Sequence, residues 1–212
     1  MTTTTPVHLS PVGERREQPG ETDAVVELVG RLQRGERSAT REAWHRFAPM
    51  VRRMVIRTLG PSSDVDDVCQ EVFMTFFERI GTLREARTAP AFIISITAFK
   101  IRHHLRWRRV RRWLSFSGHV QDLDGHAVRA DSEPREALAR FFEILDRLSP
   151  LDRTAFSLRF IEGLELLDVA AALDMSLATT KRRLTRTWAR LAVFVNKDPA
   201  LKDLLPKLPN AV

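Results

Sequence analysis

Several residue types on which whole classes of protein depend are scarce in this sequence. Cys69 is the one cysteine among 212 residues, so an internal disulfide and a cysteine-rich zinc site are both excluded. No apolar run approaches the roughly 20 residues with which a helix spans a bilayer. The first residues, MTTTTPVHLSPVGERREQPG, lack the apolar core of a signal peptide. We therefore expect a protein of the reducing cytoplasm, without membrane insertion.

Motifs for catalysis and metal binding are also missing. The chain has no HExxH pair, no glycine-rich phosphate loop and no GxSxG turn. His103 and His104 are adjacent, so on a helix they point a quarter-turn or more apart and make a poor metal pair. Cys69 falls in an apolar stripe, as an inert core residue does. We expect no catalytic residue, no metal site and no cofactor, and hence a protein that is not an enzyme.

The charge balance points to a polyanionic partner. Lys and Arg number 34 against 27 Asp and Glu, which gives a formal net charge of +7 and a pI near 10.6. Such a surplus suits nucleic acid or an acidic membrane surface, and charge alone does not choose between them. The hydrophobic share of 43% is enough for a packed core.

Helical periodicity runs through most of the chain, and we find no strand pattern. Apolar residues recur at three- and four-residue spacing from Asp23 onward, with breaks at Gly35, Gly60-Pro61 and Gly81. We predict an all-α protein with two small helical domains joined by a flexible linker, the second a helix-turn-helix domain. The predicted segments are a disordered tail (1–20), a four-helix domain (21–113), the linker (114–134), a domain of about four shorter helices (135–196) and a tail outside the core (197–212).

Residues 165–195 form the predicted helix-turn-helix, with helices at about 165–173 and 177–195. Ser176 is placed to cap the second helix. The buried positions would be Leu167, Val169 or Ala170, Leu173, Leu177, Leu184, Trp188 and Leu191. The positions left outside would be Thr179, Thr180, Lys181, Arg182, Arg183 and Arg186.

From Ser176 to Arg190 this segment has five basic residues and no acid, as a helix that enters the major groove requires. We expect Thr179 and Arg182 to read bases, and Lys181 and Arg183 to hold phosphates. The alternative is a basic, solvated helix of an ordinary bundle.

A second basic run, from Lys100 to Trp113, ends a long helix predicted at about 91–113. It has seven Lys or Arg, two His and no acid. Because so positive a helix repels itself, a bound polyanion would stabilise it, and Trp107 could stack on an unpaired base. Alternatively, Trp107 and Trp113 pack in the core or against the linker. A membrane-surface helix would also be basic, but here the apolar half precedes the basic half along the chain instead of lying opposite it.

The helix DVDDVCQEVFMTFFERI combines an apolar stripe with an acidic outer side. Asp66, Asp67, Gln70, Glu71 and Glu78 are left on that side. In so basic a protein, a concentrated acidic helix could meet a basic partner surface. The alternative is a solvated face whose acids favour the helix N-terminus through the helix dipole.

These segments, in this order, resemble the extracytoplasmic-function sigma factors, a subfamily of the bacterial sigma-70 type, over about residues 23–113 and 135–195. ELVGRLQRGERSATREAWHRFAPMVRRMV resembles the start of the family's first domain, including the pair Gly35-Glu36. The acidic pair followed by Gln70-Glu71-Val72-Phe73 resembles the family's polymerase-binding helix and is the most specific motif. AFIISITAFKIRHHLRWRRVRRW resembles the helix that opens the −10 element, and TTKRRLTR lies where the family's −35 reader has a similar run.

The resemblance implies a role for each segment. Core RNA polymerase would be bound by Asp66, Asp67, Gln70 and Glu71. Unpaired −10 bases and backbone of promoter DNA would be held by the loop Thr82–Pro90 and by Lys100, Arg102, Arg106, Trp107 and Arg109. The second domain would read the −35 duplex, and an anti-sigma factor would hold the protein inactive. The chain departs from the family's usual residues at Phe99, His103, Ala178 and Arg182, which bears on promoter sequence and strand opening.

Two functions of other classes remain open from the sequence. A stand-alone transcriptional regulator would use the helix-turn-helix alone, would leave the acidic helix unexplained, and would bind duplex DNA tightly without polymerase. An adaptor that sequesters another regulator would need no DNA contact. Co-purification with core polymerase separates these alternatives from a sigma factor.

Overall fold

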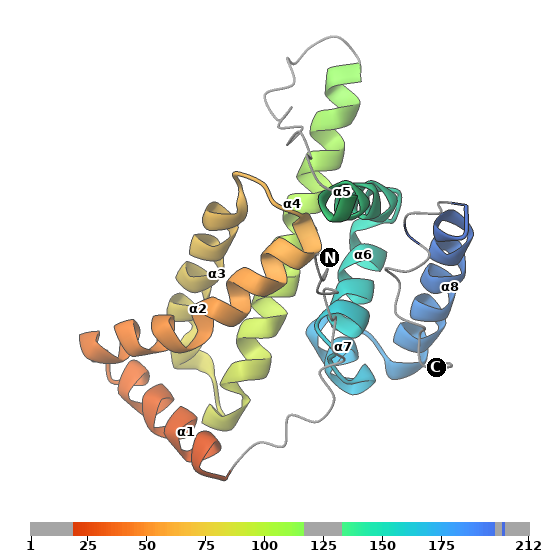
Figure 1. Cartoon of the computed structure of the whole chain (residues 1–212). Helices are drawn as coiled ribbons and strands as arrows, with labels where there is room; N and C mark the ends of the chain where they lie inside the picture. The colour runs from red at the N-terminus through yellow and green to blue at the C-terminus, as the bar shows by residue number, and fades with distance from the viewer. Residues whose placement is uncertain (1–18, 117–132, 198–200, 202–212) are drawn as a thin grey trace, which may run out of the picture.

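A computed structural model describes residues 19–116, 133–197 and 201. All regular structure in these residues is helical, which confirms the predicted all-α fold (Figure 1). The elements are α1 (Pro19–Gln33), α2 (Arg37–Leu59), α3 (Val65–Arg79), the 3₁₀ turns η1 (Ile80–Thr82) and η2 (Ala86–Thr88), α4 (Ala89–Phe116), α5 (Glu133–Asp146), α6 (Pro150–Phe156), the π-helical turn η3 (Ser157–Ile161), α7 (Leu166–Ala172) and α8 (Leu177–Val195).

The first domain, α1 to α4, is built around the apolar stripe of α3. Phe73 and Phe76 are fully buried, and the rings of Phe47 and Phe76 pack edge to face with centroids 5.8 Å apart. Truncating such a phenylalanine to alanine costs about 3–5 kcal/mol. Cys69 lies in the same core, where burial raises the pKa of its thiol. This placement agrees with the expected inert cysteine.

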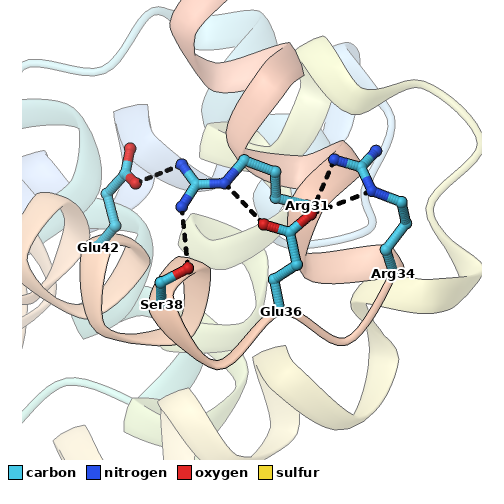
Figure 2. Close-up of polar contacts among 5 residues, drawn as sticks. All are labelled: Arg31, Arg34, Glu36, Ser38 and Glu42. Carbon is cyan, nitrogen blue, oxygen red and sulfur yellow. Dashed lines mark hydrogen bonds and ion pairs between the residues drawn. The ribbon is translucent and has the colours of Figure 1, made fainter.

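The turn between α1 and α2 is closed by an ion-pair network (Figure 2). Arg31 reaches Glu36 at 3.1 Å and Glu42 at 2.7 Å, and Arg34 reaches Glu36 at 3.0 Å. Hydrogen bonds from the two arginines lower the pKa of the Glu36 carboxyl. Gly35 has a φ of 77°, a left-handed conformation that favours glycine. The Gly35-Glu36 pair therefore shapes the turn: the glycine reverses the chain and the glutamate joins its two sides.

The second domain, α5 to α8, has a core of its own around Leu145, Phe156 and Leu191. Ser149 caps α6 by accepting a hydrogen bond from the Asp152 backbone at 3.1 Å. Leu201 is fully buried in this core. The expectation that the whole segment 197–212 lies outside the core is thus wrong at Leu201, which supplies an apolar side chain to it.

The two domains pack against each other, which the sequence did not lead us to expect. In Figure 1, α4 lies between α2 and α3 on one side and α6 and α7 on the other. Met54 of α2 and Ala98 of α4 share a buried apolar cluster with residues of the second domain, namely Ala155, Leu158, Val169, Ala172, Leu173 and Leu184. The predicted tail 1–20 and linker 114–134 fall largely outside the described residues.

Three further local expectations are corrected. Leu167 is 67% exposed on α7 and Leu177 is 43% exposed on α8, although both were predicted to be buried. The segment Thr82–Pro90 is not all loop, because it contains η2 and the first residues of α4.

None of the described helices is both long enough and apolar enough to cross a membrane.

Candidate functional site

The helix-turn-helix is formed by α7, α8 and a tight turn between them. The turn is closed by backbone hydrogen bonds from Asp174 to Ala171 (3.2 Å) and from Met175 to Ala170 (2.9 Å). Asp174 has a φ of 53°, which aspartate tolerates better than most residues other than glycine. Ser176 then caps α8, with its side chain accepting a hydrogen bond from the Thr179 backbone at 3.3 Å, as the sequence predicted.

The outward face of α8 carries most of the predicted DNA-contacting residues. Lys181, Arg182 and Arg186 are exposed, and none of them has an ion pair within the described part of the chain. Thr179 is half-buried, and its hydroxyl accepts a hydrogen bond from that of Ser176 at 2.8 Å. Arg182 therefore lies at the centre of a basic face with its guanidinium available.

Two residues predicted for this face lie elsewhere. Thr180 is fully buried, because it shares the inner side of α8 with Leu184 one turn later, and its hydroxyl donates to the Ser176 carbonyl at 3.1 Å. Arg183 is half-buried and forms an ion pair with Asp152 of α6 at 2.6 Å. The predicted outward position is wrong for both, since one fills the core and the other joins α8 to α6.

Thr185 is an exposed residue of α8 that the sequence prediction did not include. This threonine is exposed and lies three residues after Arg182, so both share one side of α8. Its hydroxyl donates to the Lys181 carbonyl at 3.1 Å. The three-residue step from Arg182 was the available signal, and the absence of charge at Thr185 concealed it.

The charged and aromatic residues in the basic half of α4 differ in their contacts and in their exposure. Lys100 forms an ion pair with Glu71 of α3 at 3.2 Å. Arg106 is exposed, and Trp107 is 53% exposed, with its indole nitrogen donating to His103 at 2.9 Å. The core position that the sequence left open for Trp107 is thereby excluded, while Trp113 is more exposed still.

Arg102 and Arg109 lie on the side of α4 that faces the second domain. Burial and the neighbouring charge of Arg106 lower the pKa of Arg102, and the charge of Asp174 in the α7–α8 turn opposes them. Arg109 remains exposed but borders a small cavity with Asp146 and Arg153 of the second domain. The predicted −10 residues therefore do not form one open surface.

Two other cations of α4 anchor that helix to the turn before α3. The Oδ2 atom of Asp64 is 2.9 Å from Nε2 of His104 and 3.0 Å from Nη2 of Arg108. Arg108 also donates to the Leu59 carbonyl at 3.3 Å. Partial burial alone would raise the pKa of Asp64, but Arg108 and His104 hold it below its ordinary value.

The acidic side of α3 separates into paired and unpaired groups. Asp66 forms an ion pair with Arg52, and Glu71 forms the pair with Lys100 already described. Asp67 and Gln70 are exposed and make no side-chain contact of this kind within the described residues. Of the four predicted polymerase contacts, these two are therefore the ones most available to a partner.

Comparison with known families places two domain models on this chain. The model for sigma-70 region 2 matches residues 43–111, and the model for sigma-70 region 4 matches residues 138–191. The first range falls within α2 to α4, and the second includes α6, α7 and most of α8. The acidic helix thus lies inside the first matched region, and the helix-turn-helix lies inside the second except for the end of α8.

Several curated relatives are similar along most of the chain. The RNA polymerase sigma factor CnrH of Cupriavidus metallidurans is 30% identical over 151 residues, which are 67% of this chain and 79% of that protein. The ECF sigma-E factor of Escherichia coli is 26% identical over 190 residues, 85% of this chain and 97% of that one. The ECF sigma factor BldN of Streptomyces coelicolor is 26% identical over 173 residues, 79% of this chain and 65% of that one.

Two solved structures share the fold. CnrH in complex with the cytosolic domain of CnrY superimposes with a TM-score of 0.61 at 22% identity, over 83% of this chain and 99% of that chain. The sigma factor RpoE in complex with the anti-sigma factor NepR, from Bartonella quintana, gives a TM-score of 0.56 at 20% identity, over 74% and 97%.

Proposed function

Because this chain belongs to the extracytoplasmic-function subfamily of sigma-70 factors, we propose that it binds core RNA polymerase and directs the enzyme to promoters. The observation that carries the proposal is the order of two matched regions: region 2 over residues 43–111 and region 4 over residues 138–191. Regions of both types in one chain supply a polymerase-binding part and a DNA-reading part. A stand-alone regulator would have no use for the first of them.

The contacts with promoter DNA are assigned to two helices. In α8, Arg182 is placed to read a base edge of the −35 duplex, while Lys181 and Arg186 hold the backbone. In α4, exposed Arg106 and Trp107 are placed to meet unpaired bases of the −10 element. Thr180 and Arg183 are omitted from this assignment because core packing and the pair with Asp152 occupy them.

The contact with polymerase is assigned to Asp67 and Gln70, whose side chains are exposed and unpaired among the described residues. A protein inhibitor is the third expected partner, since both solved relatives are in complexes: CnrH with the cytosolic domain of CnrY, and RpoE with the anti-sigma factor NepR. These partners support the cytoplasmic location that we propose for this activity.

Run-off transcription with purified core polymerase tests the proposal. We expect the chain to support promoter-dependent transcription, and Asp67→Lys to weaken its affinity for core about tenfold or more, which corresponds to about 1.4 kcal/mol. Glu71 is left unchanged because its loss would also release Lys100. Binding is measured by fluorescence anisotropy with labelled protein.

Glu27→Lys is the matched control, because Glu27 is an exposed acid of the same domain but on α1. It makes the same change in net charge and should leave core affinity unchanged. Equal losses in both variants would show a general charge effect and refute the assigned docking face. Tight duplex binding with no affinity for core would instead favour the stand-alone regulator.

A further inference from the structure

Three exposed residues form the middle of the outward face of α8. Successive residues of a helix are about 100° apart around its axis, so Ala178, Arg182 and Thr185 fall within about 60° of one another. We call these three residues the central line. Two exposed cations flank it, because Lys181 and Arg186 lie about 70° to either side of its middle. The face thus has one arginine and two small residues at its centre, with a cation on each side.

This arrangement matches the two kinds of surface that a major groove presents. The groove is about 12 Å wide, so a helix that enters it has phosphates on both sides and base edges beneath it. Lys181 and Arg186 are placed toward the two sides, where cations hold phosphates. The central line is placed toward the base edges, where the sequence is read.

The central line has few hydrogen-bond donors for bases. Ala178 has no polar side-chain group, and the Thr185 hydroxyl donates to the backbone carbonyl one turn earlier at 3.1 Å. Thr180 and Arg183, which the sequence placed on this face, are occupied within the fold. Arg182 is therefore the strong donor of the central line, whereas Ala178 and Thr185 present methyl groups.

Arginine and methyl groups recognise different bases in the major groove. Arginine donates two hydrogen bonds to O6 and N7 of guanine, whereas alanine and threonine side chains pack on the C5 methyl group of thymine. Along the axis of α8, Ala178 and Thr185 lie about 6 Å and about 4.5 Å from Arg182, at about 1.5 Å per residue. Base pairs are stacked about 3.4 Å apart, so both methyl groups reach base pairs one or two steps from the guanine.

We propose that this chain recognises its −35 element through one guanine and two thymine methyl groups. Arg182 binds the guanine, while Ala178 and Thr185 each contact the C5 methyl of a thymine, one on each side of the guanine along the groove. The inference rests on the proposed function, because it requires α8 to enter the major groove. It adds the class of sequence that is read and two residues that read it without a hydrogen bond.

Selection from a pool of promoter duplexes randomised across the −35 element identifies the bases that are read. The full-length chain in complex with core polymerase should enrich a guanine with a thymine one or two base pairs to each side. The selected duplex is then prepared with deoxyuridine in place of one thymine at a time, which removes the C5 methyl and keeps the base pair. Each replacement at a contacted thymine should weaken binding about fourfold, the effect of one buried methyl group.

Two variants assign each thymine to its residue. Thr185→Ser removes the methyl group and keeps the hydroxyl, so thymine and uracil should be bound equally at one position while the other position keeps its fourfold effect. Ala178→Gly should do the same at the other position. Thr40→Ser is the matched control, because Thr40 is an exposed threonine of α2, and it should keep both effects. Far-ultraviolet circular dichroism checks that each variant is folded.

The guanine contact is tested separately by Arg182→Lys. Lysine keeps the charge but lacks the planar fork that donates two hydrogen bonds to guanine. The preference for guanine should fall in this variant, while both effects of the thymine methyl groups remain.

A parent protein that binds the uracil and thymine duplexes equally would overturn the reading of methyl groups and leave the proposed function standing. So would a methyl effect that survives undiminished in both Thr185→Ser and Ala178→Gly. A selection that enriches no −35 sequence would refute the DNA role of α8 itself, and this inference with it.

Discussion

At the scale of single residues, cations close together in one helix have different tasks because their partners differ. Lys100 pairs with Glu71 and Arg108 pairs with Asp64, whereas Arg106 is exposed to solvent. Asp64 joins His104 and Arg108 to the start of α3. Losing Arg108 should therefore loosen α4 from the turn before α3, while losing Arg106 should spare the fold and weaken DNA binding.

The half-buried pair of His104 and Asp64 should make stability depend on pH. Burial, together with the charge of Arg108, lowers the pKa of His104 from its ordinary 6.5. As the pH falls through that ordinary value, the unfolded chain takes up a proton before the folded chain does, so the free energy of unfolding decreases. We expect lower stability at pH 5.5 than at pH 7.5, measured by urea unfolding.

His104→Gln is the informative variant, because glutamine can still donate to Asp64 but does not titrate. Its stability should change less between the two pH values than that of the parent. Asp64, whose pKa is lowered from 3.8, loses its contribution only at more acidic pH and does not interfere. An equal pH dependence in parent and variant would assign the effect to another group.

At the scale of elements, the sequence predicted where the helices begin and end better than it predicted which side of each helix is buried. The spacing predicted the last helix at 177–195, and α8 spans Leu177–Val195. The same reasoning placed Leu177 inside and Thr180 outside, and the structure has the reverse. A leucine in the sequence can be assigned to the buried side of a helix only when it is known which side of that helix faces the core. Threonine can be buried because its hydroxyl bonds to the helix's own carbonyls, here that of Ser176.

The two adjacent arginines of α8 should respond oppositely to truncation. Arg182→Ala should remove a base contact, cost about 1–3 kcal/mol of DNA binding and relax preference at one −35 position. Arg183→Ala should instead lower the melting temperature, because it leaves Asp152 of α6 without its cation. Binding to single-base −35 variants and thermal unfolding are measured for both proteins.

Lys181→Ala provides the comparison for a backbone contact. It should weaken binding to all sequences alike and reduce the slope of binding against salt concentration by about one. If Arg183→Ala alters base preference and leaves thermal stability intact, the guanidinium exchanges Asp152 for DNA in the complex. Our assignment of Arg183 to the fold would then be wrong.

At the scale of the whole molecule, the sequence indicated two helical domains but not their contact. Met54 and Ala98 lie on helices whose other buried apolar residues belong to the first core, so periodicity alone assigns them to that core. Likewise, Glu162 forms ion pairs with Arg53 and Arg57 from far along the chain, and no spacing rule links them. Family motifs identified the individual segments, whereas the contact between the two domains depends on the shapes and charges of two folded surfaces.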